Sequence, residues 1–196
     1  MKASKSTDHE IPTLLFPKQK DWADWLRKNH AKSSAVWLRL AKKNSGSQSV
    51  SYAEALEIAL CYGWIDGQKK PYDELFWLQK FTPRGVKSIW SKINKAKAGE
   101  LIKSGRMKPA GLNAVERAKQ DGRWDAAYDS PSVSTVPADF QARLNKSAKA
   151  KAFFATLNSA NRYAILFRIQ TAKKAETRAR KIEQFIEMLE RKEKLH

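Results

Sequence analysis

The hydrophobic residues keep a helical period after residue 88, whereas strand and helix periods both occur before it, and this difference restricts the fold more than any other feature. Residues 36–40 and 75–81 alternate between faces in the way of a strand. From residue 88 onward the apolar residues recur at helical spacing. Strands followed by a run of helices are typical of an α+β protein. The sequence therefore predicts a mainly helical α+β fold, in which a small antiparallel sheet of about three strands packs with helices and a C-terminal helical region follows.

Capping and breaking residues set the predicted boundaries. Ser51 and Glu54 form a capping box at the start of one helix, and Gly63 can end it in the left-handed conformation. Residues 64–68 predict the third strand, with Asp66-Gly67 as a hairpin turn. Further helices are predicted over 18–30, 88–104, 109–122, 138–144, 147–156, 159–170 and 174–193. We expect a flexible N-terminus at 1–10, an α+β core at 11–128, a linker at 129–137 and a helical region at 138–196 packed on the core.

The chain is strongly basic, and its charge is uneven. It holds 38 Lys and Arg against 20 Asp and Glu, a net charge of +18. Residues 80–108 hold nine basic side chains against Glu100, and residues 143–181 hold eleven against Glu176. Dispersed lysines can serve solubility alone, whereas clustered ones favour an anionic partner: nucleic acid, an acidic protein or anionic lipid head groups. The candidate anion-binding surface comprises Lys146, Lys149, Lys151, Lys173, Lys174, Arg178, Arg180 and Lys181.

Cysteine content and hydropathy predict a cytoplasmic location. Cys61 is the single cysteine, which excludes an internal disulfide framework and fits a reducing compartment. No run of about 18 apolar residues, the length of a membrane span, occurs in the sequence. The first residues contain no apolar segment long enough for a signal peptide and carry Asp8 and Glu10 where one is expected. The oligomeric state stays open.

Polar side chains among large aromatic ones between residues 64 and 97 form a candidate ligand cleft. On a helical wheel of residues 88–104, Trp90, Ile93 and Leu101 share one face, and Lys97 falls within it. Lys97 either extends its ammonium out of a packed interface or needs an anion, such as Asp66 or a ligand. A few polar groups in an apolar cleft are typical of small-molecule sites. The candidate cleft residues are Trp64, Asp66, Gln68, Trp77, Gln79, Arg84, Trp90, Ser91, Asn94 and Lys97.

Motifs for metals, cofactors and covalent catalysis are missing from the sequence. His9, His30 and His196 are not spaced with other ligands, so we expect no metal. Neither GxGxxG nor a P-loop occurs, so we expect no cofactor. Cys61 has no partner base in any motif and is predicted to pack as a small apolar residue. The catalytic residues, if there are any, stay unknown.

Several segments resemble the bacterial YdeI/OmpD-associated family. They are SYAEALEIALCYGWIDG at 51–67, WLQKFTPR at 77–84, SIWSKIN at 88–94, GRMKPAG at 105–111 and TRARKI at 177–182. The similarity runs in order through most of the chain from about residue 15. It implies a cytosolic α+β protein linked to protection against bacteriocins or cationic antimicrobial peptides, and it supplies no catalytic mechanism.

Three functions follow as hypotheses. The protein binds an anionic partner in a stress or peptide-resistance response, or it is a small-molecule-binding protein or enzyme that uses the cleft between Trp64 and Lys97, or it is a protein–protein scaffold. A protein of charge +18 repels cationic peptides. Any protection against such peptides is therefore expected to be indirect.

Overall fold

The computed structural model describes residues 11–196, and the chain divides into two compact units. The first unit contains residues 11–88 and 96–122, and the second contains residues 89–95 and 123–196. The predicted flexible segment at 1–10 lies outside the described residues. The predicted division into a core, a linker at 129–137 and a helical region stays a prediction.

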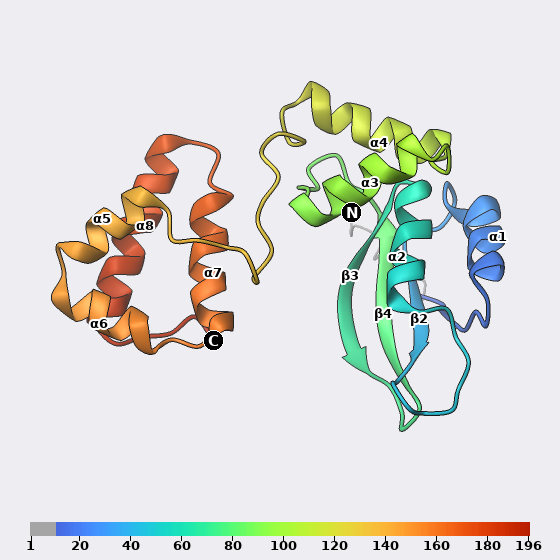
Figure 1. The fold of residues 1–196 in the computed structure, drawn as a ribbon, viewed down its shortest axis with the longest axis horizontal. Coiled ribbons are helices and arrows are strands. Elements are labelled where there is room, and N and C mark those ends of the chain that lie inside the picture. Colours follow the sequence, from blue (N-terminus) through green and yellow to red (C-terminus); the bar gives the residue numbers. More distant parts are fainter. Residues whose placement is uncertain (1–10) are drawn as a thin grey trace, which may run out of the picture. The chain divides into compact units, whose positions relative to one another are not determined.

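A four-stranded mixed sheet organises the first unit (Figure 1). Strands β2 (Val36–Ala41) and β3 (Trp64–Pro71) both pair antiparallel with β4 (Phe76–Pro83), which confirms the three strands predicted. A fourth strand, β1, pairs in parallel with β2 and has only two residues, too few to show a period. In sheet order the strands are β1 (Thr13–Leu14), β2 (Val36–Ala41), β4 (Phe76–Pro83) and β3 (Trp64–Pro71).

Helices α1 (Gln19–Asn29) and α2 (Tyr52–Cys61) pack together at the sheet face that buries Val36 and Phe81. Trp22 of α1 links the layers, because its ring lies 5.6 Å from that of Phe81 and its Nε1 donates to the carbonyl of Ala55, 3.1 Å away. Directly opposite residues in antiparallel strands share a face. The register therefore puts Trp37 and Lys80, which are paired, on the other face.

The predicted ends of α2 are confirmed. The Ser51 hydroxyl accepts a hydrogen bond from the amide of Glu54, and the Glu54 carboxylate accepts one from the amide of Ser51. Gly63 ends the segment with φ of +72°, a conformation that side chains disfavour. Helix α4 (Pro109–Gln120) crosses close by, so that a Cβ atom on Gly111 would lie 2.7 Å from the carbonyl oxygen of Leu60 and also against that of Cys61. Only glycine permits this approach.

The predicted hairpin turn at Asp66-Gly67 is wrong. Both residues lie within β3, and the pairing register with β4 shifts just after Asp66. The chain turns at residues 72–75 instead. There the Asp73 carboxylate accepts hydrogen bonds from the amides of Leu75 and Phe76, at 2.8 and 2.7 Å. Asp73 thus supplies the turn chemistry that Asp66 was expected to supply.

Helix α3 spans Lys92–Lys103 and is shorter than predicted. The expected apolar face is partly wrong: Trp90 precedes the helix and Ile93 is 49% exposed, whereas Leu101 is buried. The boundary between the two units falls within this helix, because residues up to Lys95 belong to the second unit. A single helical wheel therefore combined side chains that serve different units.

The second unit is a cluster of four helices around one apolar core (Figure 1). Phe140, Ile165, Ile169 and Leu189 are completely buried in it. The four predicted C-terminal helices are confirmed within a few residues. They are α5 (Ala138–Asn145), α6 (Ala148–Thr156), α7 (Ser159–Gln170) and α8 (Ala175–Glu190).

Residues 89–95 are held to the start of the second unit by specific contacts. Trp90 is buried and its ring meets that of Trp124 edge-on, with centroids 4.9 Å apart. The amide of Tyr128 donates to the Trp90 carbonyl at 2.9 Å. Lys92 Nζ lies 2.7 Å from a carboxylate oxygen of Asp129. These contacts explain why the N-terminal turn of α3 belongs to the second unit.

Candidate functional site

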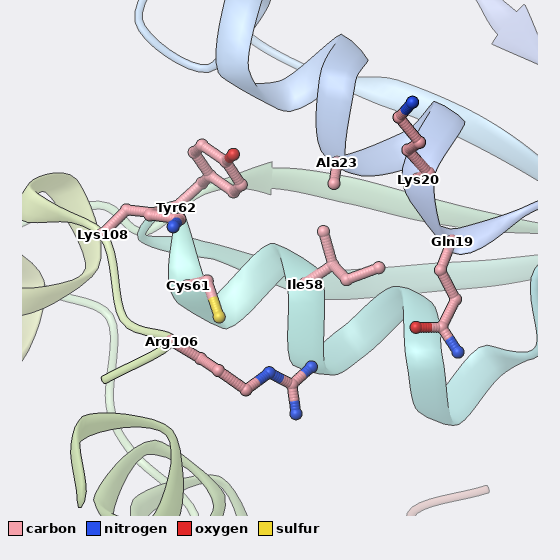
Figure 2. A pocket seen from close by; sticks show the side chains of 8 residues that line it. All are labelled: Gln19, Lys20, Ala23, Ile58, Cys61, Tyr62, Arg106 and Lys108. Carbon is pink, nitrogen blue, oxygen red and sulfur yellow. The ribbon is translucent and has the colours of Figure 1, made fainter. Parts of the chain in front are cut away.

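A pocket of about 400 Å³ opens in the first unit between α1, α2 and the segment before α4 (Figure 2). Its floor includes Ile58 and Cys61 of α2, and its remaining wall carries several long polar side chains. The complete lining is Gln19, Lys20, Ala23, Ile58, Cys61, Tyr62, Arg106 and Lys108.

Two helices begin at this pocket. Gln19 and Lys20 open α1, and Lys108 is the N-cap residue of α4, where its side chain makes no capping hydrogen bond. The N-terminal end of a helix carries a partial positive charge, and unpaired amides there can bind an anion. Together with the cations of Lys20, Arg106 and Lys108, these helix ends make the electrostatics of the pocket suitable for a small anion.

One carboxylate, that of Glu57 on α2, balances part of this charge. Its oxygens lie 3.3 Å from Arg106 and 3.5 Å from Lys97. Lys97 is therefore a partly exposed cation with Glu57 as its counter-ion, and Asp66, the carboxylate suggested for it, has another partner. Shared between two cations, a single carboxylate leaves the neighbourhood with an excess of positive charge.

Cys61 forms part of the pocket floor in Figure 2 but is not set up as a nucleophile. Its side chain is buried, which confirms that it packs as a small apolar residue. Burial raises the pKa of its thiol, and the charges of Arg106 and Lys108 oppose that shift only partly. Because the thiolate is the reactive form, the thiol is inert near neutral pH.

The aromatic residues of the predicted cleft lie in different surroundings. Trp64 is in the core, where its Nε1 donates to the carbonyl of His30 at 3.1 Å. Trp77 is half-buried beside Tyr52, with ring centroids 6.2 Å apart. Trp77 also lines a separate pocket of about 320 Å³ with Lys69, Lys70 and Pro71. Trp90 belongs to the second unit.

The polar residues of the predicted cleft mostly bond to nearby backbone or side chains. Asp66 accepts from the hydroxyl of Tyr52 at 2.8 Å. Gln79 is 3% exposed, and its Nε2 donates to the carbonyls of Gly67 and Gln68, which secures the irregular part of β3. These contacts give Asp66 and Gln79 structural tasks in the sheet.

The rest of that predicted group divides between the units. Arg84 is buried and its guanidinium donates to the Ser88 hydroxyl at 3.4 Å in the first unit. Ser91 accepts from the amide of Asn94 at 3.1 Å in the second unit, where it caps the start of α3. The ten residues of the predicted cleft are thus divided between the two units.

The eight cations of the predicted C-terminal surface also differ from one another. Arg178 forms a two-pronged ion pair with Asp139, and Lys181 donates to the carbonyl of Arg168 at 3.0 Å. Both side chains therefore join elements of the second unit. The other six are exposed and form no ion pair within residues 11–196; they are Lys146, Lys149, Lys151, Lys173, Lys174 and Arg180.

Three of the exposed six lie near the two ends of α8. Arg178, near the start of α8, pairs with Asp139 of α5, and Glu190 at its end accepts from Ser147 at 2.6 Å. At 1.5 Å per residue, these two contacts are about 18 Å apart along the helix axis. Lys173 and Lys174 directly precede α8, whereas Lys146 adjoins Ser147. The six cations thus form at least two separate groups.

Among the residues that the structure describes, no group of three or more His, Cys, Asp or Glu side chains is placed to hold a metal ion. None of the helices described has both the length and the apolar character needed to cross a membrane.

Two family models match this chain. Residues 14–114 match a domain of unknown function (DUF8412), and residues 133–192 match the family described as bacteriocin-protection, YdeI or OmpD-associated. The DUF8412 model covers about half of the chain, which therefore belongs to that family, and residues 133–192 carry the match to the YdeI/OmpD-associated family. This confirms the resemblance found in the sequence. No curated protein and no solved structure is significantly similar to the chain.

The two candidate sites lie in different family matches. The pocket of Figure 2 lies within the DUF8412 match, and all eight cations of the C-terminal surface lie within the other match. Four of the five segments that carried the resemblance, between residues 51 and 111, also fall in the DUF8412 match.

Sequence reasoning missed the pocket. Its lining comes from three stretches, at 19–23, 58–62 and 106–108, that only the folded chain brings together. One signal was available, the basic residue directly before Pro109 at a predicted helix start. A cation at a helix N-terminus is unfavourable by itself and is therefore worth marking as a possible anion site.

Proposed function

We propose that this member of the YdeI/OmpD-associated family acts in the cytoplasm by binding an anionic partner. Its role in protection against bacteriocins or cationic antimicrobial peptides is then indirect, because a net charge of +18 repels such peptides. The same positive charge attracts a partner that carries phosphates or carboxylates on its surface.

The observation that carries the proposal is the placement of Lys173 and Lys174 at the start of α8. Lys174 occupies the N-cap position and satisfies no amide of the first helical turn with its side chain. Both lysines are exposed, and neither forms an ion pair within residues 11–196. Glu176 in the first turn offsets this charge only in part. An anion at this end of the helix relieves the unfavourable arrangement.

The experiment measures binding of the full chain to a fluorescent DNA duplex, and to vesicles of anionic lipid, over a range of salt concentrations. Polyanion binding through several lysines falls steeply with salt. We expect the double variant Lys173→Glu/Lys174→Glu to weaken binding about tenfold or more. The matched control reverses Lys103 and Lys119, which are exposed in the first unit. If the chain binds neither the duplex nor the vesicles at low salt, the proposal is contradicted.

A second candidate function, binding of a small anionic ligand, is favoured by the pocket of Figure 2. Three cations and the starts of two helices surround a floor that contains Cys61. Inorganic phosphate is the probe, and the heat of binding in isothermal titration calorimetry is the readout. We expect phosphate to bind the native protein but not Arg106→Gln/Lys108→Gln. The absence of a binding heat in the native protein, or equal binding in the variant, contradicts this function.

A further inference from the structure

The sheet face opposite α1 and α2 carries a second group of cations, which we call the outer sheet face. The register places Trp37 opposite Lys80, and Leu78 between Arg39 and Lys70 on neighbouring strands. Leu78 is 2% exposed, whereas Lys70 is exposed and the side chains of Trp37, Arg39 and Lys80 are half-buried. The long basic side chains thus cover an apolar centre.

Each of these cations lies over an aromatic ring. Lys70 Nζ is 4.5 Å and Lys80 Nζ 5.8 Å from the centroid of the Trp37 ring. The guanidinium of Arg39 lies 5.5 Å from the ring of Phe76 and 5.9 Å from that of Tyr72. Cation–π contacts of this kind hold a charge in place without neutralising it.

Carboxylates do not balance this face. Arg39, Lys70 and Lys80 form no ion pair within the described part of the chain. The Nε of Arg39 is buried and has no hydrogen-bond acceptor among those residues. The nearest turn carries Asp73, whose carboxylate accepts from two amides of the turn. The face therefore carries three cations that pair with no carboxylate of the described residues, beside the half-buried rings of Trp37 and Phe76.

We propose that the outer sheet face binds single-stranded nucleic acid. This goes beyond the proposed function, because it adds an anion-binding surface in the first unit to the one at the start of α8 and names its partner. A single strand presents phosphates and unstacked bases together, and these fit cations and aromatic rings that alternate on one surface. A base that stacks on Trp37 replaces the lysine on that ring, and the released ammonium pairs with the adjacent phosphate.

Other polyanions match this face less well. A DNA duplex keeps its bases stacked inside, and anionic vesicles and acidic proteins present charge without nucleobases. For those partners the rings add nothing specific to the attraction of the lysines. The preference for a single strand over a duplex of equal length is therefore the distinguishing property.

The test compares the full chain on a labelled 20-nucleotide oligothymidylate, a 20-base-pair duplex and anionic vesicles. We expect tighter binding to the single strand. We expect Trp37→Ala to weaken single-strand binding roughly tenfold, while duplex binding stays unchanged. Trp37→Phe retains a ring and is expected to recover most of the affinity. Circular dichroism and thermal unfolding establish that each variant is folded.

A charge variant tests the phosphate contacts separately. Replacing Arg39, Lys70 and Lys80 by Gln is expected to lower the slope of log affinity against log salt by about 2 for the single strand. The matched control replaces Lys43, Lys103 and Lys119, which are exposed, by Gln.

Three outcomes overturn the inference. They are equal affinity for single strand and duplex, an unchanged single-strand affinity in folded Trp37→Ala, and an equal loss in the control charge variant. In those cases binding to the duplex or to vesicles keeps the proposed function intact. If no polyanion binds at all, both proposals fail.

Discussion

The two units of this protein use their basic side chains in different ways. In the first unit, Lys70 and Lys80 lie over the ring of Trp37, and Arg106 and Lys108 surround a pocket. In the second unit, Arg178 ties α8 to α5 through Asp139. A similar excess of charge thus places cations over rings and around a pocket in one unit, and in the other it is divided between exposed cations and helix-to-helix links. Charge counted along the sequence does not distinguish the two uses.

The units are also held together differently. Close backbone approach secures the first unit, where Gly111 of α4 meets the carbonyls at the end of α2. An apolar cluster and ion pairs between helices secure the second, where Arg143 pairs with Glu183 as Arg178 pairs with Asp139. The predictions below test this contrast.

The largest expected effect is that of Gly111→Ala in the first unit. The added methyl group meets two backbone carbonyls that cannot rotate away, so we expect a loss of about 3 kcal/mol in the free energy of unfolding. Urea unfolding measures the loss, and hydrogen exchange locates it in the first unit. Gly99→Ala in α3 is the control, since a Cβ there meets nothing within 4 Å; it is expected to stabilise the helix slightly. Equal effects of both substitutions contradict the close approach.

The next largest effect, a gain in stability, is expected from Lys174→Asp in the second unit. Aspartate at the N-cap accepts a hydrogen bond from the first turn and suits the positive end of α8, so stability rises by about 1 kcal/mol. Affinity for polyanions falls in the same variant. Ser51→Asp is the control, because Ser51 already caps α2, and little change is expected there. If the variant is stabilised but binds polyanions as tightly as the wild type, Lys174 is not part of the proposed site.

The smallest effect concerns the pH dependence of the link between α5 and α8. The hydrogen bonds from Arg178 lower the pKa of Asp139 in the folded protein. The Asp139 carboxylate therefore contributes its full stabilisation above about pH 3.9, the pKa of Asp in the unfolded chain. This contribution disappears as the pH falls through the lower pKa of Asp139 in the folded protein. Because the Asp139 side chain is 47% exposed, we expect only about 0.5 kcal/mol between wild type and Asp139→Asn near neutral pH.

Urea unfolding of both proteins between pH 6 and pH 2 measures this difference. It should vanish at the acid end of the range. Asp24→Asn, in an exposed pair with Arg27 on α1, is the control, and a smaller change is expected. A difference between wild type and Asp139→Asn that is constant with pH shows that the carboxylate contributes through packing and not through its charge.

Much of the fold followed from local signals. The capping box at Ser51, the alternation in β2 and the helical spacing after residue 137 each predicted an element that the structure contains. Such signals depend on neighbours within one turn or one strand, and the backbone obeys them in most surroundings. The prediction for Asp66-Gly67 was wrong because that pair suits a turn or a bulge equally well, and the pairing of β3 with β4 decides between them.

The sequence by itself determined the class of this protein, its excess of positive charge and its family. These properties depend on residue identity and on spacing along the chain. Only the tertiary structure decided which cations are available, because Arg178 and Lys174 look alike in the sequence and differ only in that Asp139 lies across from one of them. The pocket and the outer sheet face arise in the same way, from strands and helices that are distant in sequence and adjacent in space.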